Sequence, residues 1–404
     1  MTDRRKTSVM VTLAIVFATA AWWSAPHSVT PGALQDRGQP FFPAFTDPNE
    51  ARALEVIEYD ETTSTVRPFK VLNRDGRWTI PSNYNYPADG GDRLSSVAAA
   101  IISLKKDDVA SDNAADHERC GVLDPLDETL PTVKGRGTRI TVQGQNDRVL
   151  ADVIVGRSVE SRPALRYVRL PSQQRVYVAN VGDLSASTTF QDWIERDLLL
   201  VERNEIDQIL IRHSSVDSET GNVQLNEVLA LGRGAPDQWT LAGLQAGETI
   251  DPFRMNLLVT KLDELTIDDV RPKASGIARL LSEPKAGQKL AASEIADLES
   301  KGFFVSNAGL MLSSEGDVLV HTTSGVFYTL RFGKVVSDSR GGQGRYLFAS
   351  ASYDSTAAGA APAPETAQRL AFLRARFVPW YYIVSDDTFS KIHLRRKDLV
   401  KGRG

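Results

Sequence analysis

The sequence predicts an α+β protein in which two tandem copies of a mixed sheet-plus-helix unit follow an N-terminal transmembrane anchor. An uncharged run follows three basic residues near the N-terminus, and the tripeptide that begins at Trp78 returns in similar form at Trp239. Segments with alternating apolar side chains lie around both positions, and such alternation is typical of strands with one buried face. A length of 404 residues also suits more than one domain.

The composition is that of a folded protein without a concentrated surface charge. Hydrophobic residues make up 42% of the chain and charged residues 24%, which are ordinary values for globular domains. The net charge of −4 argues against a general affinity for nucleic acid, because that affinity needs a concentrated basic surface. Cys120 is the single cysteine, so the chain can form no internal disulfide and no complete cysteine-based zinc site.

Residues 1–26 have the features of a membrane segment. Basic residues at positions 4–6 precede an uncharged run at 8–23, an order that keeps the leading end in the cytoplasm and sends the remainder across the membrane. Two interpretations remain open, a signal peptide cleaved after the small residues at 18–20 and an uncleaved anchor. Cleavage there would expose Trp22 and Trp23 near a new N-terminus, so we favour the anchor in the inner (cytoplasmic) membrane. In both cases the body lies in the periplasm or extracytoplasmic space.

Residues 27–50 form a predicted linker between this segment and the body. The linker contains Pro31, Pro40, Pro43 and Pro48. At this density proline prevents regular structure and gives a semi-rigid spacer. We therefore expect the linker to hold the folded part away from the bilayer.

The offset of 161 residues between Trp78 and Trp239 also aligns two amphipathic helices. Apolar residues at the helical spacing i, i+3, i+4 and i+7 form one stripe in each helix. The paired stripe residues are Leu94, Val97, Ala98, Ile101 and Leu104 in the first helix, and Met255, Leu258, Val259, Leu262 and Leu265 in the second. Asp89 is a candidate cap for the first helix, and Asp251 followed by Pro252 starts the second.

Later segments match as well, and they define the expected domains. Residues 149–157 resemble 326–334, 166–168 resemble 345–347, 176–178 resemble 381–383, and 197–198 resemble 398–399. We therefore expect a first α+β unit at 51–205 and a second at 206–404, with insertions in the second near 273–293 and 352–377. The last insertion ends in a helical stripe of Leu370, Leu373 and Phe377, for which packing on its own domain is favoured over partner binding.

The sequence contains none of the motifs that mark a catalytic or nucleotide site. A nucleophile elbow, a phosphate-binding loop and a zinc-binding H-E-x-x-H helix are all absent from it. The paired glycines lie between strand-like segments, where hairpin turns explain them. We therefore expect no enzyme activity, no cofactor, and neither catalytic nor metal-binding residues.

Two sets of residues have spacings that occur in metal sites. His117 and Cys120 stand three residues apart, but the sequence offers no second pair of ligands, so we expect a surface histidine beside a buried cysteine. Acidic pairs follow both amphipathic helices, at 107–108 and at 268–269. Paired carboxylates serve acid–base or calcium chemistry in other proteins. Since no calcium-loop pattern surrounds these pairs, we expect solvated turns.

The recurring tryptophans and the basic C-terminus are also given structural roles. Trp78 and Trp239 begin predicted strands, and we expect them to be core anchors rather than ligand platforms. The C-terminal basic residues could contact anionic lipid headgroups. Their alternation with Ile392 and Leu394 favours a last strand with one solvated face. These basic residues are Lys391, Arg395, Arg396, Lys397, Lys401 and Arg403.

The order of these features resembles the bacterial family known as domain of unknown function 4340. The segments that carry the resemblance are 76–80, 87–89, the stripe to Leu104, 120–125, 155–157, 166–168, 302–303, 330–333 and 380–382. Cys120 stands where family members commonly have tyrosine. The resemblance implies an N-terminal anchor, an extracytoplasmic body and an association with an ABC-type transport system of the gliding-motility kind. It carries over no catalytic residue.

Two main hypotheses for the function follow, and a third, an unrecognised hydrolase, ranks last because the sequence shows no nucleophile–base set. The first is a membrane-anchored, non-enzymatic accessory or scaffold protein whose partners are the membrane and the subunits of an ABC-type transporter. The alternative is a free-standing extracytoplasmic module that binds an envelope polymer or a peptide. Neither hypothesis includes a nucleic-acid partner.

Overall fold

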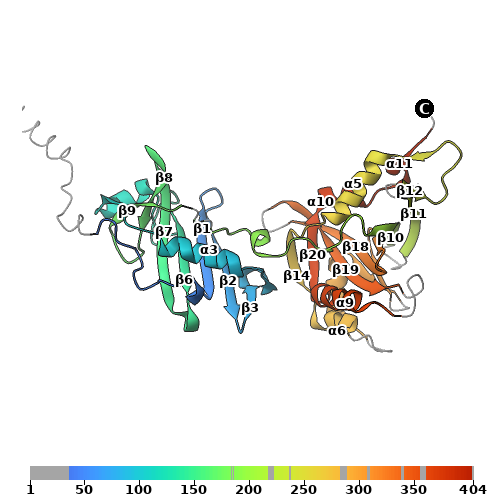
Figure 1. Cartoon of the computed structure of the whole chain (residues 1–404), viewed down its shortest axis with the longest axis horizontal. Coiled ribbons are helices and arrows are strands. Elements are labelled where there is room, and N and C mark those ends of the chain that lie inside the picture. Colours follow the sequence, from blue (N-terminus) through green and yellow to red (C-terminus); the bar gives the residue numbers. More distant parts are fainter. Residues whose placement is uncertain are drawn as a thin grey trace, which may run out of the picture. The chain divides into compact units, whose positions relative to one another are not determined.

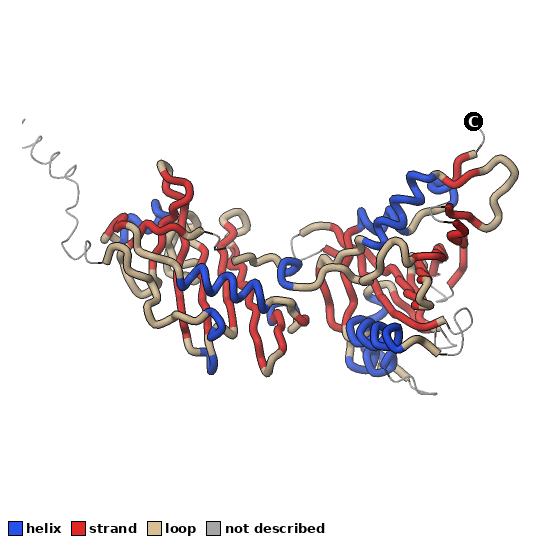
Figure 2. The backbone as a smooth tube through the Cα atoms, in the orientation of Figure 1, coloured by secondary structure: helices blue, strands red, loops and turns tan. Residues whose placement is uncertain are grey.

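The computed structural model contains helices and antiparallel sheets (Figures 1 and 2). It describes residues 36–402 except 183, 185, 217–222, 236–237, 283–288, 307–309, 338–340 and 355–360. The predicted anchor at 1–26 lies outside these residues. Within the described part of the chain, no helix is both long enough and apolar enough to cross a membrane.

The chain divides into two compact units. One unit combines residues up to Pro68 with Leu94–Ala186, and the other combines Phe69–Arg93 with the residues from Ser187 onward. The hairpin and turn within Phe69–Arg93 therefore belong to the second unit.

The first large sheet has nine strands in the order β4-β3-β2-β1-β6-β7-β8-β9-β5. Its pairs are antiparallel, with Val56 of β1 opposite Ile140 of β6 and Tyr167 of β8 opposite Val178 of β9. The strands are β1 (Ala53–Asp60), β2 (Thr65–Arg74), β3 (Arg77–Ile80), β4 (Tyr86–Pro87), β5 (Asp108–Ser111), β6 (Thr138–Gln143), β7 (Val149–Val159), β8 (Arg162–Arg169) and β9 (Val176–Asn180).

The second large sheet has eight strands in the order β12-β11-β10-β17-β18-β19-β20-β14. Its strands are β10 (Ile206–Val216), β11 (Val223–Ala235), β12 (Gln238–Leu241), β14 (Asp269–Pro272), β17 (Asp317–Thr322), β18 (Val326–Ser337), β19 (Gln343–Tyr353) and β20 (Trp380–Ser385). Two small sheets pair β13 (Thr249–Ile250) with β21 (Val400–Lys401) and β15 (Phe303–Val305) with β16 (Met311–Ser313).

The helices bury the apolar stripes that the sequence predicts. Leu94, Val97, Ala98 and Ile101 are buried on α3 (Gly91–Ile102), and Met255, Leu258, Val259 and Leu262 are buried on α5 (Pro252–Asp263). Helix α9 (Pro364–Phe377) likewise buries Leu370, Leu373 and Phe377, so this stripe packs on its own domain. The remaining α-helices are α4 (His117–Cys120), α6 (Ser275–Ser282), α7 (Ala292–Ser300), α10 (Asp386–Ile392) and α11 (Arg396–Leu399).

The end of the proline-rich segment packs on the first unit. The backbone N–H of Phe41 donates to the carbonyl oxygen of Leu104 at 3.0 Å. The ring of Phe41 meets that of Tyr177 edge-on at 5.3 Å, and Phe45 is buried. Residues 36–50 are therefore part of the folded body, whereas the sequence assigned them to the spacer.

The glycines of the sequence segments 120–125 and 155–157 let two backbones approach closely. Gly121 ends α4 with a φ of 69°, a conformation that favours glycine. A Cβ atom at Gly156 would lie 2.4 Å from the carbonyl oxygen of Cys120. Cys120 packs with Val122 and Ile154 in the same buried cluster. Packing of the α4 turn on β7 thus explains both segments.

The C-terminus is helical where the sequence predicts a strand. Ser385 caps α10, because its side chain accepts a hydrogen bond from the backbone N–H of Thr388 at 3.0 Å. Ile392 and Leu394 are both buried, but Ile392 is the last residue of this helix and Leu394 lies two residues after it, so neither belongs to an extended strand. The only strand formed after Ser385 in the described residues is the short β21. The expected solvated strand is therefore wrong.

Candidate functional site

His117 is buried, contrary to the predicted surface position. The residue is only 7% exposed, and the Nε2 atom of its imidazole lies 2.7 Å from the carbonyl oxygen of Gln174. This tertiary contact holds the imidazole inside. Cys120 is buried as predicted, and burial raises the pKa of its thiol. The pair is therefore part of the packing, since a buried thiol with a raised pKa is a poor nucleophile.

The two acidic pairs have different surroundings. Asp108 is exposed, but Asp269 is only 1% exposed, so the prediction of a solvated turn is wrong for the second pair. The carboxylate of Asp269 accepts hydrogen bonds from the backbone of Val270 at 2.8 Å, from Arg271 at 2.7 Å and from Asn83 at 3.2 Å. Among the described residues, no group of three or more histidine, cysteine or acidic side chains could hold a metal ion.

The recurring tryptophans are half-buried rather than core anchors. Ile80 and Leu241, which end the same two strands, are the buried residues. Trp239 instead lines an open groove between β12 and α5. We call this the β12–α5 groove; it has a volume of about 610 Å³ and is lined by Arg203, Gln238, Trp239, Thr240, Ile250, Pro252, Met255, Asn256 and Val259.

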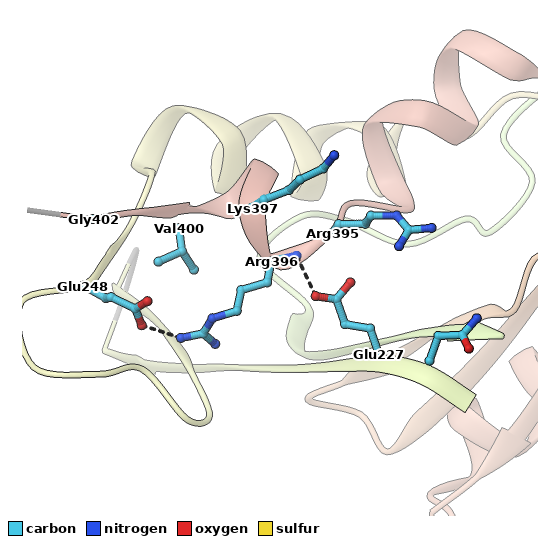
Figure 3. Close-up of a pocket in the computed structure, with 8 residues that line it drawn as sticks. Glu227, Glu248, Arg395, Arg396, Lys397, Val400 and Gly402 are labelled. Carbon is cyan, nitrogen blue, oxygen red and sulfur yellow. Dashed lines mark hydrogen bonds and ion pairs between the residues drawn. The ribbon is translucent and has the colours of Figure 1, made fainter. Parts of the chain in front are cut away.

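A charged cleft near the C-terminus is the candidate site (Figure 3). We call it the C-terminal cleft. It has a volume of about 610 Å³ and is lined by Asn226, Glu227, Glu248, Arg395, Arg396, Lys397, Val400 and Gly402. Strand β11, the segment before β13, helix α11 and strand β21 contribute these residues.

Local interactions fix the position of helix α11 at this cleft. The carboxylate of Asp398 accepts from the backbone N–H of Arg395 at 3.1 Å, which caps the first turn. The carbonyl oxygen of Leu399 accepts from the backbone N–H of Asp251 at 2.8 Å. Strand β21 then pairs with β13, with Val400 opposite Ile250.

Arg396 is the centre of the polar contacts in the C-terminal cleft. Figure 3 shows its guanidinium paired with Glu248 and its backbone N–H directed at Glu227. The N–H of Arg396 donates to Glu227 Oε1 at 3.2 Å, and its guanidinium also donates to the carbonyl oxygen of Gly243 at 3.0 Å. A backbone hydrogen bond from Gln245 and the ion pair with Arg396 lower the pKa of Glu248.

A histidine pair lies next to Glu227, and in it His213 is buried and His393 is half-buried. The rings of His213 and His393 have centroids 4.0 Å apart, and His213 Nε2 lies 3.9 Å from the Glu227 carboxylate. Burial lowers the pKa of His393 to about 3, and His213, Arg345 and Arg395 add to the effect. His393 is therefore neutral at physiological pH.

The charged groups of the C-terminal cleft differ in their pairing and exposure. The lowered pKa of Glu248 keeps it ionised at neutral pH, far from the value that general acid–base catalysis needs. Arg395 and Lys397 are exposed at the mouth of the cleft. The C-terminal cleft can therefore recognise a charged or polar chain. The basic residues were visible in the sequence, but the acidic partners were not, because Glu227 on β11 and Glu248 just before β13 are distant from them in the sequence.

A buried lysine is a further feature that sequence reasoning missed. Lys273 Nζ donates to the carbonyl oxygen of Phe377 at 2.8 Å and lies 4.0 Å from the centre of the Phe348 ring. Burial lowers its pKa well below the ordinary value. Its position on a strand-to-helix connection gives no signal in the sequence.

Comparison with known proteins identifies the family. The family described as Domain of unknown function (DUF4340) matches residues 78–284, just over half of the 404 residues. This range begins at Trp78 and includes both acidic pairs and α5. No curated protein and no solved structure matches the chain.

Proposed function

The chain belongs to the DUF4340 family, and we propose that it is a membrane-anchored extracytoplasmic scaffold made of two copies of one α+β unit. In this proposal residues 1–26 are the anchor, and the body is an accessory subunit of an ABC-type transport system of the gliding-motility kind. The observation that carries the proposal is the strand order of the two large sheets.

Eight strands have the same order in both sheets. In the first sheet the order is β3-β2-β1-β6-β7-β8-β9-β5, and in the second it is β12-β11-β10-β17-β18-β19-β20-β14. Each strand of the first series has a counterpart at the same position in the second sheet, and the counterparts follow one another along the chain in the same order. Helix α3 precedes the edge strand β5, as α5 precedes β14. Both orders place their two non-consecutive neighbours at the same positions, β1-β6 and β9-β5 in one sheet and β10-β17 and β20-β14 in the other. This shared order supports duplication of one unit.

The segments that begin each copy support the same conclusion. The N–H of Phe41 donates to the carbonyl oxygen of Leu104 at 3.0 Å, and the N–H of Leu198 donates to that of Leu265 at 2.8 Å. Leu104 lies two residues after the end of α3, and Leu265 lies two residues after the end of α5. This correspondence aligns residues 197–198 with residues 40–41, whereas the sequence comparison aligned residues 197–198 with residues 398–399.

The ends of the copies correspond as well. The N–H of Asp89 donates to the carbonyl oxygen of Trp193 at 2.8 Å, as the N–H of Asp251 donates to that of Leu399 at 2.8 Å. We therefore propose copies at 36–193 and 194–402, which refine the expected boundary at 205–206.

A scaffold role agrees with this organisation. Two related copies present two related surfaces, and a second weak contact within one complex gains from a high effective concentration. The anchor would confine both surfaces to the membrane plane. The C-terminal cleft adds charged groups suited to recognition.

Co-purification tests the transporter association. We expect transporter subunits to be identified by mass spectrometry with the detergent-solubilised full chain. A variant without residues 1–25 should be soluble and folded, yet should fail to complement a deletion strain. Replacing positions 8–23 by an unrelated single-pass segment is the matched control and should restore function. Full activity of the untethered body would contradict the proposal.

The alternative is a free-standing module that binds an envelope polymer or a peptide. The open C-terminal cleft favours it, because Arg395 and Lys397 are exposed there. Binding of purified envelope polymer by the full chain, without any co-purified transporter subunit, would support this alternative.

A further inference from the structure

One sheet edge is covered by the chain itself in the first copy. Strand β4 pairs with the outer side of β3, with Ile80 opposite Tyr86. The carbonyl oxygen of Trp78 accepts from the N–H of Ala88 at 2.9 Å, and that of Ile80 accepts from the N–H of Asn85 at 3.0 Å. The outward backbone groups of β3 therefore have partners.

The corresponding edge is open in the second copy. Strand β12 is the last strand of its sheet, and it pairs with β11 so that Thr240 lies opposite Gly232. The segment that corresponds to β4 is β13, which pairs with β21 instead. Trp239 and Leu241 have the positions of Trp78 and Ile80, so their backbone groups face outward. Among the described residues, neither makes a backbone hydrogen bond on that side.

The β12–α5 groove lies beside this open edge. Its buried apolar residues, Met255 and Val259, come from α5, and the half-buried Trp239 comes from β12. Arg203 and Asn256 contact each other at the exposed rim. Phe253, one position after the groove residue Pro252, is 70% exposed. Unpaired strand edges with apolar neighbours are sites at which another chain adds a strand.

We propose that β12 and the β12–α5 groove bind an extended peptide segment of a partner protein, which adds a strand to the sheet as β4 does in the first copy. The main chain of the segment would pair with Trp239 and Leu241. The β4 sequence indicates the side chains that fit. Tyr86 lies on the same face as Trp78, so an aromatic residue at this place in the segment would lie on the face of Trp239. Proline is accepted after it because Pro87 pairs with Thr79 without an N–H.

The inference takes its template from the two-copy organisation of the proposed function, but it needs neither the anchor nor the transporter. Failure of the peptide experiment below would leave the co-purification experiment unaffected, and the reverse also holds. The two proposals can therefore fail separately.

The probe is a fluorescent synthetic peptide with the sequence of residues 82–90, tested against the full chain in detergent. We expect saturable binding. Hydrogen exchange at the amides of Trp239 and Leu241 should slow by about tenfold or more at saturation, because exchange then requires the peptide to leave. A peptide with Tyr86→Ala, as the matched control, should bind at least about tenfold more weakly.

Substitutions in the chain separate the backbone contact from the groove. Trp239→Pro removes an outward N–H, which an edge strand tolerates, and should weaken binding about tenfold or more. Trp239→Thr keeps that N–H and should retain the amide protection at Leu241. Asn256→Trp blocks the groove from an exposed position, where folding is not at risk. Arg254→Trp, at an exposed position of α5 that does not line the groove, is the matched control and should bind normally.

No saturable binding up to about 1 mM peptide, or binding that protects other amides, would overturn the inference. Dimerisation of the full chain that Asn256→Trp abolishes would instead identify a second copy of the chain as the occupant. Circular dichroism melting of each variant verifies that loss of binding is not loss of folding.

Discussion

Two regions that the proposed duplication pairs differ clearly, and in each of them a helical turn meets the strand that precedes α3 or α5. In the first copy Tyr86 and Phe190 form an edge-on aromatic pair at 5.5 Å, and each is 4% exposed. The proposed duplication aligns them with Glu248 and Arg396, which form an ion pair in the open C-terminal cleft. An aromatic pair gains from exclusion of water, whereas an ion pair at a wet surface avoids most of the cost of desolvation. If the two regions share one backbone framework, as proposed, their different exposure to solvent accounts for the different chemistry placed on it.

The residues that close the copies should give the largest effects. Trp193 and Leu399 are both fully buried, and Trp193 also donates from Nε1 to the carbonyl oxygen of Ser187 at 2.9 Å. We expect Trp193→Ala to lower the free energy of unfolding by about 3–5 kcal/mol and Leu399→Ala by about 2–5 kcal/mol. Urea denaturation measures both. A loss below about 1 kcal/mol for either variant would break the correspondence of the two closing turns.

The helical stripes should respond equally in the two copies. Ile101 on α3 and Leu262 on α5 are both 0% exposed. Ile101→Ala and Leu262→Ala should each cost about 2–5 kcal/mol, from lost transfer free energy and the cavity left behind. Guanidinium denaturation gives the values, and Ser96→Ala on α3 is the control. A clear loss in one copy and none in the other would show that the two helices have different roles.

Lys273 should make the stability depend on pH in the second unit. Because its pKa in the folded state is lowered, the unfolded state binds more protons between that value and the ordinary lysine pKa of about 10.4. The stability of the natural chain therefore rises with pH across this window. Lys273→Met should raise the free energy of unfolding by about 1–2 kcal/mol at the low-pH end of this window, where the cost of burying the charge is greatest. This gain should vanish at pH values above the window. A gain that does not change between pH 7 and 10 in urea denaturation would contradict the proposed charge effect.

The ion pair of the C-terminal cleft should give the smallest effect. Arg396 and Glu248 retain 31% and 26% of their side-chain exposure, so screening by water leaves little net stabilisation. Glu248→Gln should lower the melting temperature only slightly, and less so at high salt. Because the pKa of Glu248 is lowered in the fold, this contribution is present above the ordinary glutamate pKa and is lost as the pH falls through the folded value. Tyr86→Ala, the counterpart in the first copy, should have a much larger effect; equal effects would contradict the comparison.

The helices and strands were predictable from the sequence because their signals are local. The stripes of α3 and α5 follow the helical period. Trp78 and Trp239 are the second residues of strands β3 and β12 and are not their buried residues. The C-terminus misled prediction, because the alternation of Ile392 and Leu394 resembles a strand while the cap at Ser385 starts a helix.

The surroundings of individual polar residues could not be predicted. Asp269 is buried by a contact with Asn83, 186 residues earlier, and His117 by one with Gln174, 57 residues later. The C-terminal cleft depends in the same way on Glu227 and Glu248, which meet Arg396 only after the strands have assembled. No local pattern encodes such partners, because they depend on the tertiary arrangement of the chain.

The packing of Phe41 and Phe45 sets a limit on the distance between body and bilayer. If residues 1–26 are the anchor, only positions 27–35 separate it from the part that the structure describes. Nine residues reach at most about 30 Å when fully extended. Residue 36, at the start of the described body, would then lie within that distance of the membrane surface, and the packing of Phe41 and Phe45 would keep the adjoining part of the first unit close to the lipid.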